Sequence, residues 1–276
     1  RIDWMWANKA VFDANGISVP TTWDELNAAA DKLQAAGIIP FAHGGQAWQD
    51  ATVFEAVAMG LGGNNYYKNC YVDLKESCLR SETTVKVFDQ MRKLQGYTDE
   101  GSPGRDWNVA TGMVIEGKAG FQIMGDWAKG EFTAAGKTPG VDYYCAATPS
   151  NNGYLYNVDS FIFYKSSDPD KQAGQKLLAK LMMGKNFQKV FNLYKGSIPA
   201  RLDVSMDEFD KCAKTSNADI KTAGAKGGLV PSFAHGMAQG NTMKAALQDI
   251  ITEHFNSDMS SVDAANALAD SVLANM

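Results

Sequence analysis

Gly117-Lys-Ala-Gly-Phe-Gln-Ile-Met-Gly-Asp-Trp127 decides the fold, because it places a buried strand directly before a polar and aromatic corner. Its apolar side chains form a short run bounded by glycines, which is typical of a strand covered on both faces. Gly125 lets the backbone turn, so Asp126 and Trp127 follow where the carboxyl end of the strand is expected. Open α/β sheets bind ligands at that edge. A core tryptophan beside a turn aspartate is the alternative interpretation.

The same two side chains favour one class of ligand. The face of a sugar ring carries C–H groups that pack on an indole, and sugar hydroxyls hydrogen-bond to a carboxylate. Asp126 and Trp127 therefore suggest a carbohydrate site at the end of the strand.

Helix and strand signals alternate on both sides of this stretch, which indicates an α/β fold. Pro20-Thr-Thr-Trp-Asp-Glu25 predicts the start of a helix in which Thr22 caps the first turn and Glu25 completes a capping box. The turn-rich segment Pro149-Ser-Asn-Asn-Gly153 suits a crossing between two lobes. Apolar spacing predicts further helices over 81–94, 108–116, 171–183, 185–193 and most of 204–276, and strands over 38–42, 143–148 and 157–163.

The bulk composition excludes several classes of function. The net charge of −5 provides no basic surface for nucleic acid, and no run of apolar residues is long enough to span a membrane. No stretch of the printed sequence has the pattern of a signal peptide. The chain opens at Arg1-Ile-Asp-Trp, inside an apolar and aromatic segment, so we expect that processing or a cut has removed the preceding residues.

The four cysteines do not form the paired spacing of a zinc site. Cys70 and Cys78 flank a short segment, so we predict a local disulfide between them in an oxidising compartment. Cys145 is expected in a strand and Cys212 in a helix, and a bridge between them is left open. Four reduced, buried thiols are the alternative.

Enzyme signatures are missing from the sequence. It contains no GxSxG, HExxH or P-loop motif, and no GxGxxG follows a strand. The three histidines are not spaced as metal ligands. We therefore expect no catalysis, cofactor or metal. The rival interpretation is a carbohydrate-active enzyme that uses Asp126 and Asp159 as its acid pair, because the two acids of a glycosidase are usually far apart in sequence.

Three polar side chains lie at or beside glycine- or proline-containing ends of predicted elements. Lys195 precedes Gly-Ser-Ile-Pro199, His235 lies in Pro231-Ser-Phe-Ala-His-Gly236, and Asp159 lies within the predicted strand 157–163. Taken singly, each has an ordinary structural explanation: a solvated cation at a helix end, a capping or packing histidine, and a turn acid.

Several segments together resemble the extracellular solute-binding proteins of ABC sugar importers, most closely the periplasmic glucose-binding proteins. The resemblance runs in register over essentially the whole chain. It is carried by Arg1–Phe12, Pro20–Glu25, Met113–Trp127, Val158–Phe161, Lys195–Pro199 and the corner around His235.

The resemblance implies a type II periplasmic binding protein, with two α/β lobes joined by a hinge and a monosaccharide, most simply glucose, held in the cleft between them. The family's sugar-binding residues match Trp127, Asp159, Lys195 and His235 in this sequence. Trp127 would stack on the sugar ring, Asp159 would accept hydrogen bonds, and Lys195 and His235 would donate them. Gln46, Trp48 and Asp126 are further candidates for the cleft. The partner would be the membrane permease of the importer, and the location the periplasm.

One departure from the family concerns the beginning of the chain. Family members start with further residues that build most of the first lobe, and Arg1 aligns with the first passage between the lobes. On this basis residues 1–12 are the inter-lobe crossing, 13–148 and the helical 201–276 form the C-terminal lobe, and 152–198 are the returned part of the N-terminal lobe. We therefore expect this chain to be the larger, C-terminal piece of a binding protein.

Overall fold

The computed structural model describes residues 1–149 and 153–276. The crossing predicted at Pro149–Gly153 lies mostly outside the described residues. Four strands form the central sheet in the order β2-β3-β1-β4. They are β1 (Trp4–Asn8), β2 (Ile39–Phe41), β3 (Ala119–Ile123) and β4 (Tyr143–Ala147). β3 runs parallel to β2 and antiparallel to β1, which also pairs antiparallel with β4. The strand expected at 117–124 is thus an inner strand, formed by Ala119–Ile123, and these five residues are all buried.

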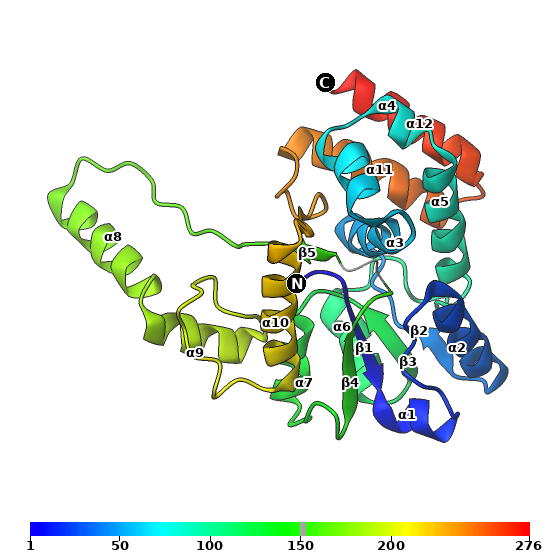
Figure 1. The fold of residues 1–276 in the computed structure, drawn as a ribbon, viewed down its shortest axis with the longest axis horizontal. Helices are drawn as coiled ribbons and strands as arrows, with labels where there is room; N and C mark the ends of the chain where they lie inside the picture. Colours follow the sequence, from blue (N-terminus) through cyan, green and yellow to red (C-terminus); the bar gives the residue numbers. More distant parts are fainter. Residues whose placement is uncertain (150–152) are drawn as a thin grey trace.

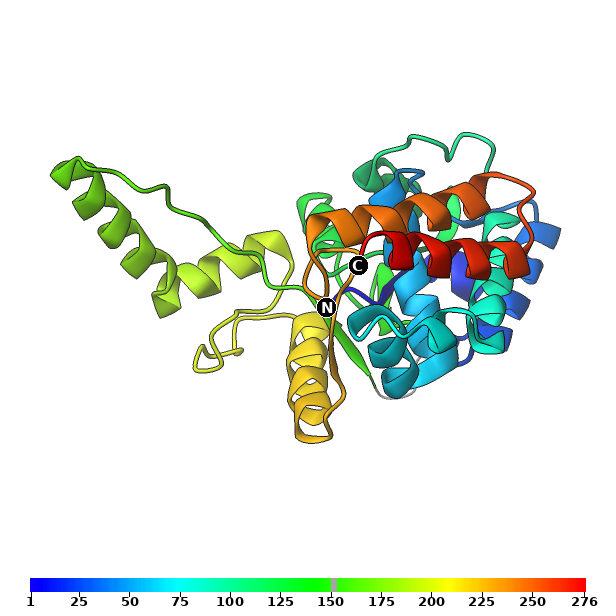
Figure 2. The ribbon, with the colours of Figure 1, turned by 90° about the horizontal axis from the view of Figure 1, so that it is seen from above.

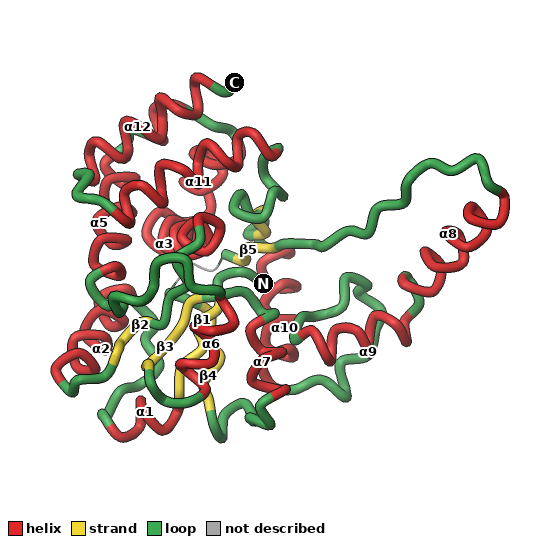
Figure 3. The backbone as a smooth tube through the Cα atoms, turned by 180° about the vertical axis from the view of Figure 1, so that it is seen from behind, coloured by secondary structure: helices red, strands yellow, loops and turns green. Residues whose placement is uncertain are grey.

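Helices cover this sheet and continue beyond it (Figure 1). They are α1 (Lys9–Ala14), α2 (Trp23–Ala35), α3 (Ala47–Tyr67), the π-helical η1 (Lys68–Val72), α4 (Glu76–Leu79), α5 (Glu82–Gln95), α6 (Trp107–Ile115), α7 (Ala128–Ala134), α8 (Pro169–Met182), α9 (Lys185–Lys195), α10 (Lys211–Ala225), α11 (Asn241–Asn256) and α12 (Ser261–Ala274). From behind, α3, α5, α11 and α12 form one helical group beside the strands (Figure 3). None of the helices in the described ranges is long and apolar enough to cross a membrane.

Local sequence signals explain where two of these helices begin. The side chain of Thr22 accepts a hydrogen bond from the backbone N–H of Glu25, and the Glu25 carboxylate accepts one from the backbone N–H of Thr22. The predicted capping box of α2 is therefore confirmed. Ser81 caps α5 in the same position relative to the helix, through a bond from the backbone of Thr84.

The central sheet separates two apolar cores. Because successive side chains of a strand point to opposite faces, β1 contributes to both. Met5 and Ala7 join the larger core, which the helical group covers, whereas Trp4 and Trp6 join a smaller core with Phe132. β1 is therefore a fully covered strand, in keeping with its apolar and aromatic composition.

All four cysteines form disulfides. Cys70 and Cys78 are bridged with their Cα atoms 5.1 Å apart, which confirms the predicted local bridge. Cys145 and Cys212 are also bridged, with a Cα–Cα distance of 6.0 Å. This second bond, left open by the sequence, fastens α10 to β4.

The segment 157–163 is not a strand, contrary to expectation. The chain instead forms β5 (Tyr154–Tyr156), which pairs in parallel with β6 (Leu229–Pro231), a short strand that the sequence did not reveal. Beyond β5 the chain extends away from the body of the molecule to α8 and α9 (Figures 1 and 2). Phe161 and Ile162 are 60% and 73% exposed. The apolar residues of this segment were misleading because a strand needs a partner, and no described strand pairs with it.

Candidate functional site

The turn after β3 places Trp127 among aromatic rings from two distant segments. Its ring centroid lies 5.2 Å from that of His235 and 6.3 Å from that of Trp48, and Trp48 meets His235 edge-on at 6.1 Å. We call these three side chains the aromatic corner. Gly125 allows the arrangement, because a Cβ there would lie 2.2 Å from the Trp127 ring. The structure thus brings together three of the residues that the sequence singled out.

Gln46 fixes Trp48 within this corner. Its side-chain oxygen accepts hydrogen bonds from the indole N–H of Trp48 at 2.8 Å and from the amide of Gln49 at 3.1 Å. Its own amide nitrogen donates to Asp106 at 2.6 Å. Gln46, predicted as a cleft residue, therefore orients the first turn of α3 and holds one ring of the corner.

His235 is held by a buried carboxylate that sequence reasoning missed. Ser232 Oγ lies 2.9 Å from His235 Nδ1 and donates to Glu55 Oε1 at 2.7 Å. Glu55, on α3, is completely buried and also accepts from the Tyr67 hydroxyl at 2.9 Å. Burial and the charge of Glu55 raise the pKa of Tyr67 well above its usual value, so this hydroxyl keeps its proton and can donate. An acid in the apolar run Val53–Ala58 was the available signal, since a buried charge needs partners.

Lys195 and Asp159 form an ion pair beside the corner. Asn157 also donates to Asp159, at 3.0 Å. Partial burial raises the pKa of Asp159, but the hydrogen bond and charge of Lys195, with a smaller contribution from the hydrogen bond of Asn157, outweigh it and leave the pKa below its usual value. Asp159 therefore acts as an ionised acceptor.

Gly196 anchors the end of α9 against the turn that carries Trp127. It has a φ of 92° in the left-handed region, and a Cβ there would lie 2.8 Å from both Asp126 O and Gly130 N. A side chain is excluded by conformation and by space together. This close approach brings Lys195 to the β3–α7 turn, so the ion pair and Trp127 occupy the same part of the molecule.

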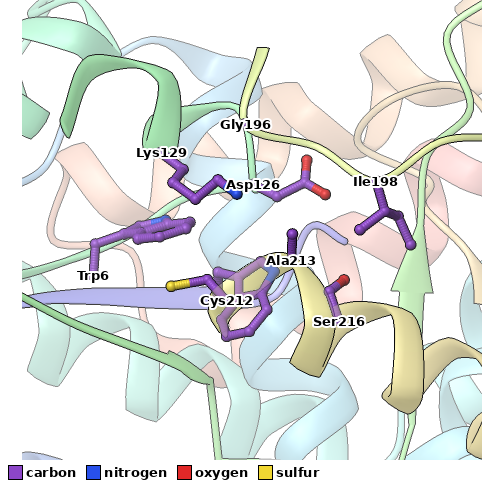
Figure 4. A pocket seen from close by; sticks show the side chains of 9 residues that line it. Trp6, Asp126, Lys129, Gly196, Ile198, Cys212, Ala213 and Ser216 are labelled. Atoms are coloured by element: carbon purple, nitrogen blue, oxygen red, sulfur yellow. The ribbon is translucent and has the colours of Figure 1, made fainter. Parts of the chain in front are cut away.

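Asp126 contacts other parts of the chain than Trp127 does. One carboxylate oxygen lies 2.8 Å from the backbone nitrogen of Arg1, and the other accepts from Ser197 Oγ at 2.9 Å. The side chain lies in a crevice with Lys129, Gly196 and Cys212 (Figure 4), which is too narrow for a water molecule. Asp126 therefore holds the segments around the aromatic corner, and its oxygens are already bonded within the protein.

A hollow opens next to Lys195 on the exposed side of α9. Its volume is about 530 Å³, and it is open to solvent, because all of its lining side chains come from the single helix α9. Phe187, Val190, Phe191 and Tyr194 line it together with Lys195. Aromatic faces beside a cation and a carboxylate can pack on a sugar ring and hydrogen-bond to its hydroxyls.

The two carboxylates of the rival acid pair have different surroundings. The lowered pKa of Asp159 does not suit the general acid of a glycosidase, which needs a raised pKa to deliver a proton, and would suit only the ionised partner of such a pair. Asp126 is bonded to Ser197 and to the backbone of Arg1, so the two carboxylates have separate partners. No cluster of three or more metal-ligating side chains occurs in the ranges that the structure describes.

The chain belongs to the bacterial extracellular solute-binding protein family, whose sequence profile matches residues 2–182. It is 48% identical over 271 residues to a probable sugar-binding periplasmic protein of Brucella suis, covering 98% of this chain and 64% of that relative. A protein of the same description from Rhizobium meliloti is 45% identical, with 98% of this chain and 65% of the relative covered. The chain thus spans slightly less than two thirds of the length of these relatives.

Solved structures share the fold at lower identity. A chitin oligosaccharide binding protein superposes with a TM-score of 0.79 at 19% identity, over 96% of this chain and 67% of that one. A bacterial solute receptor with an exclusive preference for β-D-galactopyranose gives 0.76 at 17% identity, over 98% and 69%. The predicted fold class, an α/β type II periplasmic binding protein, is therefore confirmed.

Proposed function

We propose that this chain is the larger part of a periplasmic receptor that captures a monosaccharide, glucose or a close relative, and delivers it to the permease of an ABC importer. One observation carries the proposal. Trp48, Trp127 and His235, from three distant segments, meet beside the ion pair of Lys195 and Asp159. The descriptions of the relatives from Brucella and Rhizobium support a sugar as the ligand and the periplasm as the location.

Each side chain then has a physical role in binding. Trp127 offers the stacking surface, and Asp159 accepts hydrogen bonds from hydroxyls while Lys195 donates them. Gln46 and Asp126 hold the surrounding backbone. A sugar with one hydroxyl inverted would cover one of these polar groups and leave it unpaired, which is how such a site would distinguish epimers.

We further propose that the full-length protein contains a preceding segment that completes the first lobe. The segment 157–195, which we call the arm, exposes apolar side chains that support this, because contiguous apolar surface marks a contact with another part of a protein. They include Phe161, Ile162, Tyr164, Leu177 and Leu181. In this division 1–12 cross between the lobes, 13–148 and 201–276 form the C-terminal lobe, and 152–198 return to the N-terminal lobe. The sugar would favour the closed state by contacting both lobes.

Calorimetry of the full-length protein with a panel of hexoses tests the proposal. Lys195→Ala should weaken binding by about 1.5–3 kcal/mol, the size of a hydrogen bond to a charged group, and His235→Ala by about 0.5–1.5 kcal/mol, the size of a hydrogen bond between neutral groups. Trp127→Ala should weaken it at least as much, because the stacking surface is lost. Lys189→Ala is the matched control: Lys189 lies on the same helix and pairs with Glu208 instead. Unchanged affinity in all three site variants would contradict the assignment.

The rival enzyme requires a separate assay. The full-length protein should not hydrolyse a chromogenic glucoside. Turnover that disappears in Asp159→Asn would support a carbohydrate-active enzyme instead.

A further inference from the structure

Glu55 accepts hydrogen bonds from several groups in the turn that carries His235. Besides Tyr67 and Ser232, the backbone N–H groups of Phe233 and Ala234 point to Glu55 Oε2, at 3.1 and 3.4 Å. All of these partners are donors, so Glu55 acts as an acceptor on both oxygens. The network is buried and joins α3 to the turn before α11.

The proton of Ser232 decides which nitrogen of His235 carries a proton. A serine hydroxyl has one proton, and here it is given to Glu55 Oε1 at 2.7 Å. Ser232 Oγ can then only accept, and it accepts from the backbone N–H of His235 at 3.1 Å. The contact of 2.9 Å between Ser232 Oγ and His235 Nδ1 therefore requires a proton on Nδ1.

We infer that Glu55, acting through Ser232, holds neutral His235 with its proton on Nδ1 and thereby presents Nε2 to the ligand as a hydrogen-bond acceptor. Nε2 is buried and has no partner within the described residues, as expected for an atom reserved for a ligand. The inference rests on the proposed function and assigns His235 a role opposite to the donor expected from the sequence. The ligand must then offer a hydroxyl that donates to Nε2. Glu55 and Ser232 are positioning residues.

His43 provides a contrast within the same chain. Its Nε2 lies 2.7 Å from Asp50 Oδ1, and a carboxylate requires a donor. Neutral His43 therefore carries its proton on Nε2. The structure thus assigns opposite tautomers to two of the histidines.

Nitrogen-15 NMR of the full-length protein without sugar, above the titration range of histidine, measures the tautomer directly. The resonances lost in His235→Gln identify His235, which should carry its proton on Nδ1, whereas His43 should carry it on Nε2. In Glu55→Gln the amide nitrogen should take the place of Oε1, because the Oε2 position accepts from Tyr67, Phe233 and Ala234. The amide then donates to Ser232 Oγ, the serine proton turns to Nδ1, and the proton of His235 should move to Nε2 while His43 is unchanged. In Ser232→Ala the proton should stay on Nδ1, because Glu55 Oε1 lies 3.6 Å from that nitrogen. A proton on Nε2 in the wild type or in Ser232→Ala, or an unchanged tautomer in Glu55→Gln, would overturn the inference.

In a second experiment, each hydroxyl of the best-binding hexose is replaced in turn by fluorine, which cannot donate a hydrogen bond. At one position the replacement should weaken binding by about tenfold or more in the wild type and by less in Glu55→Gln. Losses that are equal in both proteins at every position would overturn the role of Nε2. Absence of any hexose binding would overturn the proposed function instead, and the tautomer would stand, because it is measured without ligand.

Discussion

Removal of the Cys145–Cys212 disulfide should destabilise the protein more than removal of the Cys70–Cys78 disulfide. The two bridges have sequence separations of 67 and 8 residues. A cross-link restricts the unfolded chain, and the lost entropy grows with the logarithm of the loop length. At 25 °C this model assigns about 4.4 kcal/mol to the long loop and about 2.5 kcal/mol to the short one, a difference of about 2 kcal/mol.

The structure makes the two removals comparable. Each bridge joins one fully buried sulfur, Cys70 or Cys212, to a partly buried one, so replacement of each pair by alanine removes similar apolar contacts. α10 also keeps other links to its surroundings. Lys129 and Asp210 form an ion pair at 2.8 Å, and Tyr154 is hydrogen-bonded to Ser216 at 2.8 Å. We therefore expect the folded arrangement of α10 to survive, so that the loss reflects the unfolded state.

Chemical denaturation followed by tryptophan fluorescence gives the free energy of unfolding of the wild type and of the two double variants, Cys70→Ala/Cys78→Ala and Cys145→Ala/Cys212→Ala. Under reducing conditions all three should approach the stability of the variant that lacks all four cysteines. An equal loss in the two double variants, or a larger loss for the short loop, would refute the reasoning from loop length.

Two further predictions concern pH and association. Burial, followed by the charge of Arg92, lowers the pKa of His254 to about 4. In the folded chain His254 therefore stays uncharged down to about pH 4, whereas in the unfolded chain it binds a proton below about pH 6.5. Between pH 7.5 and 4, the free energy of unfolding measured by denaturation should therefore fall by about 3 kcal/mol more in the wild type than in His254→Phe. The exposed apolar side chains of the arm should make this 276-residue chain self-associate in sedimentation velocity, and Leu177→Asp/Leu181→Asp should reduce the effect. A chain that is monomeric at every concentration would contradict the second prediction.

The elements that the sequence predicted well depend on neighbouring residues. The capping box of Thr22 and Glu25 involves one turn of chain, and the 117–124 strand shows in a single apolar run between glycines. The sheet order depends on contacts across the chain: β1 lies between β3 and β4, more than a hundred residues later in sequence. No local pattern encodes that pairing, nor the bridge between Cys145 and Cys212.

The candidate site likewise has one part that local sequence predicts and another that depends on contacts across the chain. Trp127 could be predicted from the strand and the glycine before it, but its neighbours come from elsewhere in the chain, and the resemblance to a family suggested them. Glu55 escaped notice because its importance arises only when α3 meets the turn before α11. A lone acid in an apolar helix is a useful signal, since burial of an unpaired carboxylate is unfavourable and such an acid must find donors.

The stretch that decides the fold contributes to the site in two directions. Trp127 is part of the aromatic corner and contacts His235, whereas the carboxylate of the preceding residue, Asp126, accepts a hydrogen bond from Ser197 in the segment that follows Lys195. Two adjacent side chains therefore connect the sheet to the corner and to the end of α9. Because Gly196 leaves no space for a side chain at this contact, the position of Lys195 depends on the same turn that positions Trp127. The stacking surface and the cation are thus held in a common frame, although 68 positions separate 127 from 195 in the sequence.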